Sequence, residues 1–175
     1  RDMNTVLAPS ARNTPLPRIP NSDGAGEVVT VGANVTEFKP GDRVASCFFK
    51  RWQAGRISAA VMGSALGGAE EGMLSEETIL PEAALVHLPD HLSWDEAGTL
   101  TCAGVTAWHG LVARGGLKAG DTVLLLGTGG VSIFALQFAK MMGARTIITS
   151  KSGEKLERAR ALGADETINY AEIPD

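Results

Sequence analysis

The sequence predicts an α/β fold whose N-terminal part is rich in short β-strands. Up to about residue 90, short β-branched runs alternate with tight Pro-Gly turns, which is typical of a small barrel or sandwich. From residue 122 onward, apolar runs alternate with segments of helical periodicity, the order expected of a parallel sheet with right-handed crossovers. The chain is therefore expected to hold a β-rich part followed by an α/β part.

Composition agrees with a globular protein whose partners are small molecules. Of the 175 residues, 44% are hydrophobic and the net charge is −4, so neither disorder nor nucleic-acid binding is expected. No apolar run is long enough for a bilayer and no basic amphipathic segment predicts a membrane surface. The two cysteines form no disulfide framework, which favours a reducing, cytoplasmic location. Because the chain opens at Arg1 and stops at Asp175 in a charged stretch, we expect a piece of a longer protein.

The β-rich part is expected to contain short extended runs separated by one long loop. The first 20 residues are rich in Pro and Arg without a sustained period, so they are predicted to be irregular. A Pro-Gly turn at 39–42 joins the first two strands, and prolines close the later runs. The predicted extended segments are 27–32, 43–49, 77–81 and 84–89, with a long loop at 50–72.

Helical signals begin at Ser93, where Ser-Trp-Asp-Glu fits a capping box. A second helix is predicted over 102–113, ended by the glycine pair at 115–116. After a KAGD turn, strands and helices alternate in the order expected of βαβ units. The predicted strands are 122–126, 145–149 and 167–170, and the predicted helices are 130–142 and 154–162.

A glycine turn follows the first strand of the α/β part. The strand TVLLL is apolar throughout, which predicts burial on both faces. Gly127, Gly129 and Gly130 fall in the strand-to-helix turn, where unpaired N–H groups at a helix N-terminus attract a pyrophosphate. With Thr128 and Val131 they form the predicted dinucleotide-binding turn, and Ser132 stands at the packing position usually held by a third glycine. The alternative is a glycine-rich turn that binds no ligand.

The cofactor is predicted to be NADP rather than NAD. In this arrangement a carboxylate at the end of the second strand binds the ribose of NAD and repels the additional phosphate of NADP. Here that place reads TSKS, with Ser150, Lys151 and then Lys155, and the first acid is Glu154. Hydroxyl and ammonium groups suit a phosphate. The alternative is that both lysines are solvated surface charges.

Several stretches together resemble the medium-chain dehydrogenase/reductase superfamily: DGAGEVVTVGANVTEFKPGDRV, EAGTLTCAGVTAWHGL, GDTVLLLGTGGVS and EKLERARALGADETINY. The resemblance implies a truncated GroES-like barrel with connecting helices at 1–114 and a truncated Rossmann domain, the first half of a doubly wound parallel sheet, at 115–175. It also implies an active site in the cleft between the domains.

The same resemblance bears on zinc. The alcohol dehydrogenase branch takes one zinc ligand from a histidine in a Gly-His-Glu-Gly-x-Gly stretch, and Ser22 occupies that place here. Cys102 matches another ligand of that branch, but a lone thiol in an apolar stretch is commonly a core residue. The loop at 50–72 lacks the four cysteines of the structural zinc lobe. No metal is therefore expected, and the chain is most similar to the zinc-independent, quinone oxidoreductase-like branch.

By resemblance, Lys155 and Tyr170 contact the phosphorylated ribose, and Thr106 lies beside the cofactor near its nicotinamide end. Asp23, at the place of the family's glutamate, is a candidate for organising the catalytic cleft. The implied activity is NADP-dependent hydride transfer to or from a quinone, enone or similar carbonyl substrate, in a possible homodimer. Two alternatives stay open: a zinc alcohol dehydrogenase with atypical ligands around Cys102, and, if the 175 residues are the whole product, a non-catalytic nucleotide-binding or assembly remnant.

Overall fold

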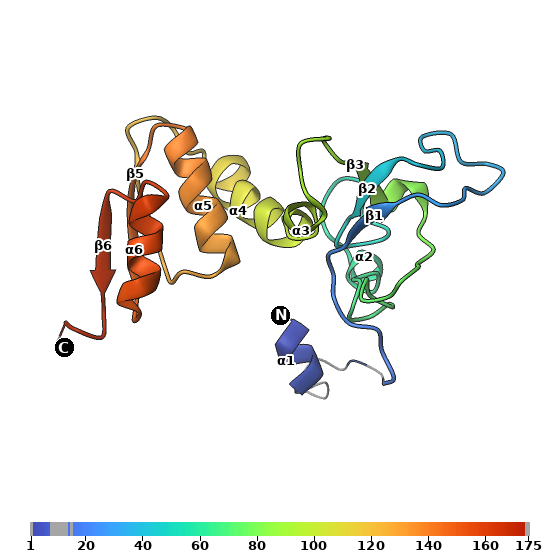
Figure 1. Ribbon diagram of the computed structural model, residues 1–175, viewed down its shortest axis with the longest axis horizontal. Coiled ribbons are helices and arrows are strands. Elements are labelled where there is room, and N and C mark those ends of the chain that lie inside the picture. The colour runs from blue at the N-terminus through green and yellow to red at the C-terminus, as the bar shows by residue number, and fades with distance from the viewer. Residues whose placement is uncertain (1, 8–13, 15, 174–175) are drawn as a thin grey trace. The chain divides into compact units, whose positions relative to one another are not determined.

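The computed structural model describes residues 2–7, 14 and 16–173, and it divides into two compact units, Arg1–Cys102 and Ala103–Asp175 (Figure 1). The division falls before the predicted domain boundary at 114/115, and the helix between these two positions, α4 (Val105–Trp108), packs on α5 (Gly130–Met141) of the second unit. Within the described residues, no helix has both the length and the apolar character needed to cross a membrane.

The first unit is built on a three-stranded antiparallel sheet in the order β1-β2-β3 (Figure 1). Its strands are β1 (Ala25–Glu27), β2 (Arg43–Ser46) and β3 (Leu85–His87). The central strand β2 pairs with both neighbours, so that Ala45 lies opposite Ala25 and Val86. Ala45 is 1% exposed and Ser46 is fully buried, which makes β2 the core of this unit.

Three predictions for this unit are wrong. Residues 1–20 are not all irregular, because the helix α1 (Asp2–Leu7) uses a stretch free of Pro and Gly. The strand predicted at 27–32 instead spans Ala25–Glu27, because the pairing with β2 ends at Arg43 and the next residue, Val28, bonds to Asp42 and Gly41 of the turn that precedes β2. Of the extended runs at 77–81 and 84–89, only the second forms a strand, and Ile79 of the first is 93% exposed.

Charged side chains bonded to backbone groups hold the loops of the first unit. The Arg43 guanidinium donates to the carbonyls of Asp90 at 3.0 Å and Leu92 at 2.6 Å, and stacks 4.2 Å above the Trp94 ring. The Glu82 carboxylate accepts from the backbone N–H groups of residues 36 and 37, and Glu71 accepts from the N–H of residue 19. These contacts join segments more than 40 residues apart in sequence.

The long loop predicted at 50–72 is largely present, with one helix of four residues, α2 (Ala59–Met62), capped by Ser58. Its two ends are joined by Glu70, whose carboxylate pairs with Lys50 and Arg51. The hydrogen bond from Lys50 is the largest influence on the Glu70 carboxyl, and it holds the pKa of that group below its ordinary value. The loop is therefore closed by an ion pair at its base.

The helical region between the sheets begins where the sequence predicted. Ser93 and Glu96 form both bonds of the capping box at the start of α3 (Trp94–Ala97). The second predicted helix is present as α4 (Val105–Trp108) between two π-helical segments, η3 (Leu100–Gly104) and η4 (His109–Arg114), and ends at the glycines 115–116. A 3₁₀ turn, η2 (Glu82–Ala84), precedes β3.

The second unit holds a parallel sheet in the order β4-β5-β6, as its alternating pattern predicted; Figure 1 labels β5 and β6 of this sheet. The elements are β4 (Thr122–Leu125), α5 (Gly130–Met141), β5 (Arg145–Ser150), α6 (Gly153–Ala161) and β6 (Glu166–Asn169). Leu125 and Ile148 of the sheet form one core with Leu136 of α5 and Leu156 of α6. Both helices therefore cover the same face of the sheet, as successive right-handed crossovers in one direction require.

The prediction that β4 is buried on both faces is wrong within this chain. Leu125 is 6% exposed on the helix-covered face, whereas Leu124 is 57% exposed on the other face and Leu126, just beyond the strand, is 75% exposed. β4 is also an edge strand of the sheet. Apolar side chains such as Leu124 are therefore not buried by the described residues.

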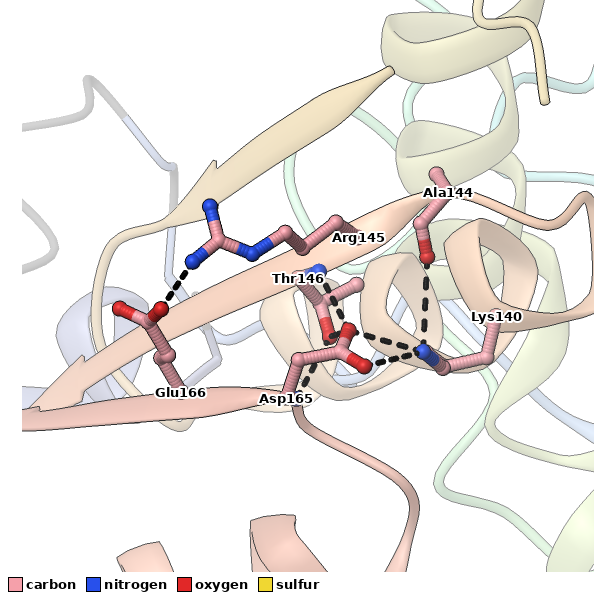
Figure 2. Close-up of polar contacts among 6 residues, drawn as sticks. All are labelled: Lys140, Ala144, Arg145, Thr146, Asp165 and Glu166. Carbon is pink, nitrogen blue, oxygen red and sulfur yellow. Dashed lines mark hydrogen bonds and ion pairs between the residues drawn. The ribbon is translucent and has the colours of Figure 1, made fainter. Parts of the chain in front are cut away.

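A carboxylate fastens the end of the sheet opposite to the glycine turn (Figure 2). Asp165 accepts two hydrogen bonds of 2.8 Å from the Lys140 ammonium of α5, one of 2.7 Å from the Thr146 N–H and one of 2.9 Å from the Thr146 hydroxyl. These donors lower the pKa of Asp165 to about 2, with Lys140 contributing most. Beside it, Arg145 and Glu166 form an ion pair across β5 and β6.

Candidate functional site

The predicted cofactor-binding residues of the second unit gather at the carboxyl ends of its three strands. β4 is followed by the glycine turn, β5 ends at Ser150, and the backbone N–H of Tyr170, just beyond β6, donates to the Ser150 carbonyl at 3.2 Å. In open α/β sheets this edge is where ligands bind. The candidate site comprises the predicted residues Gly127, Thr128, Gly129, Gly130, Val131, Ser150, Lys151, Lys155 and Tyr170.

The glycine turn presents the N-terminus of α5 without a side-chain cap. Gly129 is the N-cap residue, and no side chain bonds to the first turn from that position. The first intrahelical bond runs from the Ile133 N–H to the Gly129 carbonyl, so the N–H groups of the preceding turn have no partner within the helix. These donors and the helix dipole suit an anion at this point.

Gly127 and Gly129 differ in whether their backbone conformation requires glycine. Gly127 has φ +79°, a left-handed conformation that only glycine adopts readily. Gly129 has an ordinary extended backbone, φ −84° and ψ 175°, and a Cβ there would meet no atom within 4 Å. Neither backbone strain nor packing within the chain therefore requires glycine at 129, and the open space above it is available to a ligand.

Four hydroxyl groups surround the turn. The Gly127 N–H donates to the Thr149 hydroxyl at 3.1 Å, and the hydroxyls of Thr128 and Ser150 lie 3.2 Å apart. Ser132, at the place of the third glycine, donates to the Leu126 carbonyl at 2.9 Å and so joins the first turn of α5 to the end of β4. The sequence shows the Thr149 hydroxyl at the end of the second strand among the groups that suit a phosphate, but its bond to the Gly127 N–H is seen only in the structure.

The basic residues beyond β5 are open to solvent. Lys151 and Lys155 are exposed, as is Tyr170 at 54%. Ser152 caps α6 by accepting from the Lys155 N–H. Glu154, the acid nearest to both lysines in the sequence, forms an ion pair at 2.7 Å with Arg158 one turn further on. Glu154 therefore pairs with Arg158 and not with Lys151 or Lys155.

Thr106 lies in the same unit, on the exposed side of α4. It stands one turn beyond Ala103, whose Cβ is 3.5 Å from the position that a Cβ on Gly130 would take. Trp108 fixes α4 on α5 through an edge-to-face contact with Phe138, with ring centroids 5.4 Å apart. The start of α4 is thereby held beside the glycine turn.

Asp23 lies in the first unit, in a segment whose backbone is tightly constrained. Asn21 has φ 69°, and a Cβ on Gly67 would come within 2.7 Å of the Asn21 backbone. The Asp23 carboxylate accepts from the buried Ser22 hydroxyl at 2.6 Å and from the Cys102 backbone N–H at 3.0 Å. Both of its oxygens are therefore engaged, and the carboxylate holds the Cys102 backbone within η3.

The residues around Asp23 do not fit a zinc site. Ser22 is 2% exposed, and its hydroxyl donates its proton to the Asp23 carboxylate. Zinc in proteins is bound by cysteine sulfur, histidine nitrogen or carboxylate oxygen, and the Ser22 side chain offers none of these. Among residues 2–7, 14 and 16–173, no three His, Cys, Asp or Glu side chains lie where they could share a metal ion.

Two protein families match the chain. The alcohol dehydrogenase GroES-like domain matches residues 1–90, and the family named zinc-binding dehydrogenase matches residues 130–175. A zinc-type alcohol dehydrogenase-like protein of Schizosaccharomyces pombe is 49% identical over 161 residues, which are 91% of this chain and 46% of that protein. The chain thus spans about half the length of this relative.

Solved structures give the same result. The crystal structure of a protein from Sinorhizobium meliloti 1021, described as an alcohol dehydrogenase, superimposes with a TM-score of 0.91 at 47% identity, over 99% of this chain and 52% of that one. The Escherichia coli quinone oxidoreductase in complex with NADPH superimposes with a TM-score of 0.77 at 26% identity, over 99% of this chain and 48% of that one. The fold of both units therefore recurs in longer chains, one of which was solved in complex with NADPH.

Proposed function

The chain belongs to the medium-chain dehydrogenase/reductase superfamily, and from this premise we propose that it is part of an NADP-dependent oxidoreductase that works without zinc. The proposed substrate is a quinone, an enone or a similar carbonyl compound. The cofactor supplies the hydride chemistry when it is bound, and the chain supplies binding and orientation. The predicted cytoplasmic location and homodimer belong to the same proposal.

The observation that carries the proposal is the open N-terminus of α5 with its uncapped glycine at 129. A pyrophosphate above Gly129 would accept from the free N–H groups of the first helical turn. Lys151 and Lys155, exposed beyond the neighbouring strand, are proposed to bind the 2′-phosphate of NADP, with Tyr170 beside them. Thr106 is proposed to lie toward the nicotinamide end. Asp23 is proposed to organise the catalytic cleft, and its carboxylate accepts from the Cys102 N–H.

The cofactor preference is tested by titrating NADPH and NADH into the chain and, in parallel, into the longest form that the gene encodes. We expect NADPH to bind at least about tenfold more tightly, because an ammonium–phosphate contact contributes about 1.5–3 kcal/mol. Lys155→Met should weaken NADPH binding by about that factor and leave NADH unchanged. Lys118→Met is the matched control, because Lys118 precedes the amino end of β4, at the opposite end of the strand from the glycine turn. Equal affinities in the wild-type protein would contradict the NADP proposal.

The glycine turn is tested by Gly129→Ala. No atom of the chain occupies the space of the new methyl group, so the free energy of unfolding should change by less than about 0.5 kcal/mol. Binding of both dinucleotides should weaken by at least about tenfold, because the methyl group would keep the pyrophosphate from the helix N-terminus. Gly110→Ala serves as the control, since a Cβ there also meets nothing within 4 Å. Unimpaired binding by Gly129→Ala would argue against a ligand at this turn.

A zinc-dependent alcohol dehydrogenase is the second candidate. It is favoured by the name of the family that matches residues 130–175 and by the S. pombe relative. Metal analysis of the purified full-length protein separates the two candidates. Stoichiometric zinc that is lost together with activity would overturn the zinc-independent proposal, and full activity without zinc would support it.

A further inference from the structure

The hydroxyls at the end of β5 lie against the glycine turn, and this placement gives them a role of their own. Ile148 pairs with Leu125, so Thr149 and Ser150 continue beyond the last paired residue of β4 and reach the turn. The Thr149 hydroxyl accepts from the Gly127 N–H at 3.1 Å, and the Ser150 hydroxyl lies 3.2 Å from that of Thr128. Two successive residues of the turn are thus bonded to two successive residues of the neighbouring strand.

The Ser150 hydroxyl is engaged within the protein. Ser150 is 5% exposed, and its oxygen also accepts from the Ser152 N–H at 3.2 Å. A serine hydroxyl has one proton and two lone pairs, and the contacts with Thr128 and Ser152 use most of this capacity. Ser150 therefore links the glycine turn to the N-cap of α6 instead of extending into solvent.

These bonds counter a specific weakness of the turn. Three of its four residues from 127 to 130 are glycines, which have the largest conformational freedom to lose on binding. A turn already fixed by the neighbouring strand presents its N–H groups to a ligand at a smaller entropic cost. The Gly127 N–H itself is used in this fixation, so the donors left for a ligand are those of the first turn of α5.

We propose that Thr149 and Ser150 are positioning residues for the dinucleotide, which act by fixing the glycine turn and not by touching the phosphate of NADP. This inference rests on the proposed function. It differs from that function in its consequence, because the pyrophosphate is common to NADPH and NADH. Loss of a positioning hydroxyl should weaken both cofactors equally, whereas loss of a phosphate contact should weaken only NADPH.

The test uses Thr149→Val, which keeps the β-branched shape of the side chain and removes its acceptor. We expect the Kd values for NADPH and NADH to rise by the same factor, about 5- to 10-fold, as expected for one lost hydrogen bond. Thr149→Ser should restore both. Thr167→Val, the same substitution on β6 away from the turn, should leave both unchanged. Ser150→Ala should weaken both cofactors in the same way as Thr149→Val.

A second readout needs no cofactor. Amide hydrogen exchange at Gly127 should become faster in Thr149→Val and return toward the wild-type rate in Thr149→Ser. Unchanged exchange at Gly127, or weakening of NADPH alone, would overturn the positioning role. If the wild-type protein binds neither dinucleotide, the proposed function fails and the cofactor role of these hydroxyls fails with it, while faster exchange in Thr149→Val would still establish the bond that fixes the turn.

Discussion

The two units of the chain are stabilised in different ways. In the second unit, leucine, isoleucine and alanine side chains from the sheet, α5 and α6 form one continuous apolar core. In the first unit the fully or nearly fully buried apolar residues are mostly alanines, and charged groups bonded to distant backbone atoms connect the loops. The short-stranded sheet of the first unit thus relies on directed polar contacts, whereas the sheet that bears the glycine turn relies on apolar burial.

The largest expected effect is the loss of core volume in the second unit. Leu136 is fully buried in α5, so Leu136→Ala should lower the free energy of unfolding of this unit by about 2–5 kcal/mol. Met141→Ala, on the same helix at 70% exposure, is the control and should have little effect. Urea unfolding followed by amide exchange of peptides from each unit measures the change. Equal losses in both units would show that their stabilities are not separate.

The next effect is expected in the first unit. Arg43→Met keeps the aliphatic stem but removes the donors to the 90–92 loop and the cation above Trp94, and should cost about 1.5–3 kcal/mol. Arg56→Met, an exposed arginine of the long loop, is the matched control. The same exchange experiment should place the loss in residues 16–102. A loss no larger than that of the control would mean that apolar contacts hold the first unit as well.

The same contrast explains how much could be predicted from the sequence. Each strand and helix from β4 to β6 was predicted to within about one residue, because strand runs, the glycine turn and the helix stop at Gly143 are local signals. In the first unit the capping box at Ser93 was found for the same reason, but the end of β1 at Glu27 was not. That end depends on where the partner strand turns away, and nothing in the β-branched run itself records it.

For the site, residue types could be predicted but their contacts could not. The sequence places Ser150 and Lys151 at the end of the second strand, yet only the structure distinguishes the buried hydroxyl from the exposed ammonium group. The bond between Asp23 and the Cys102 N–H joins residues 79 positions apart, which no local pattern indicates. The exposure of Leu124 could not be anticipated either, because an apolar run does not show which side of its sheet is covered.

The smallest change in stability is expected in acid, where the two units should respond at different pH values. The folded protein holds the pKa of Asp165 at about 2, below its ordinary 3.8, so the carboxylate stabilises the second unit at pH values above about 4 and loses this contribution as the pH falls toward 2. The side chain is 37% exposed, so solvent screens much of the interaction. In the first unit, the hydrogen bond from Lys50 lowers the pKa of the Glu70 carboxyl below its ordinary 4.5. As the pH falls, the contribution of Glu70 to stability should therefore begin to decline at a higher pH than that of Asp165.

Acid titration followed by amide exchange in each unit should therefore show the first unit weakening before the second. Asp165→Asn should flatten the pH dependence of the second unit's free energy of unfolding between about pH 4 and 2. It should also lower that free energy modestly at neutral pH, because an uncharged amide forms no ion pair with the Lys140 ammonium. Glu166→Gln is the control, since its ion pair with Arg145 is half-exposed on both sides. If Asp165→Asn leaves the acid profile of the second unit unchanged, the Lys140–Asp165–Thr146 contact adds nothing to the apolar core, and burial alone accounts for that unit's stability.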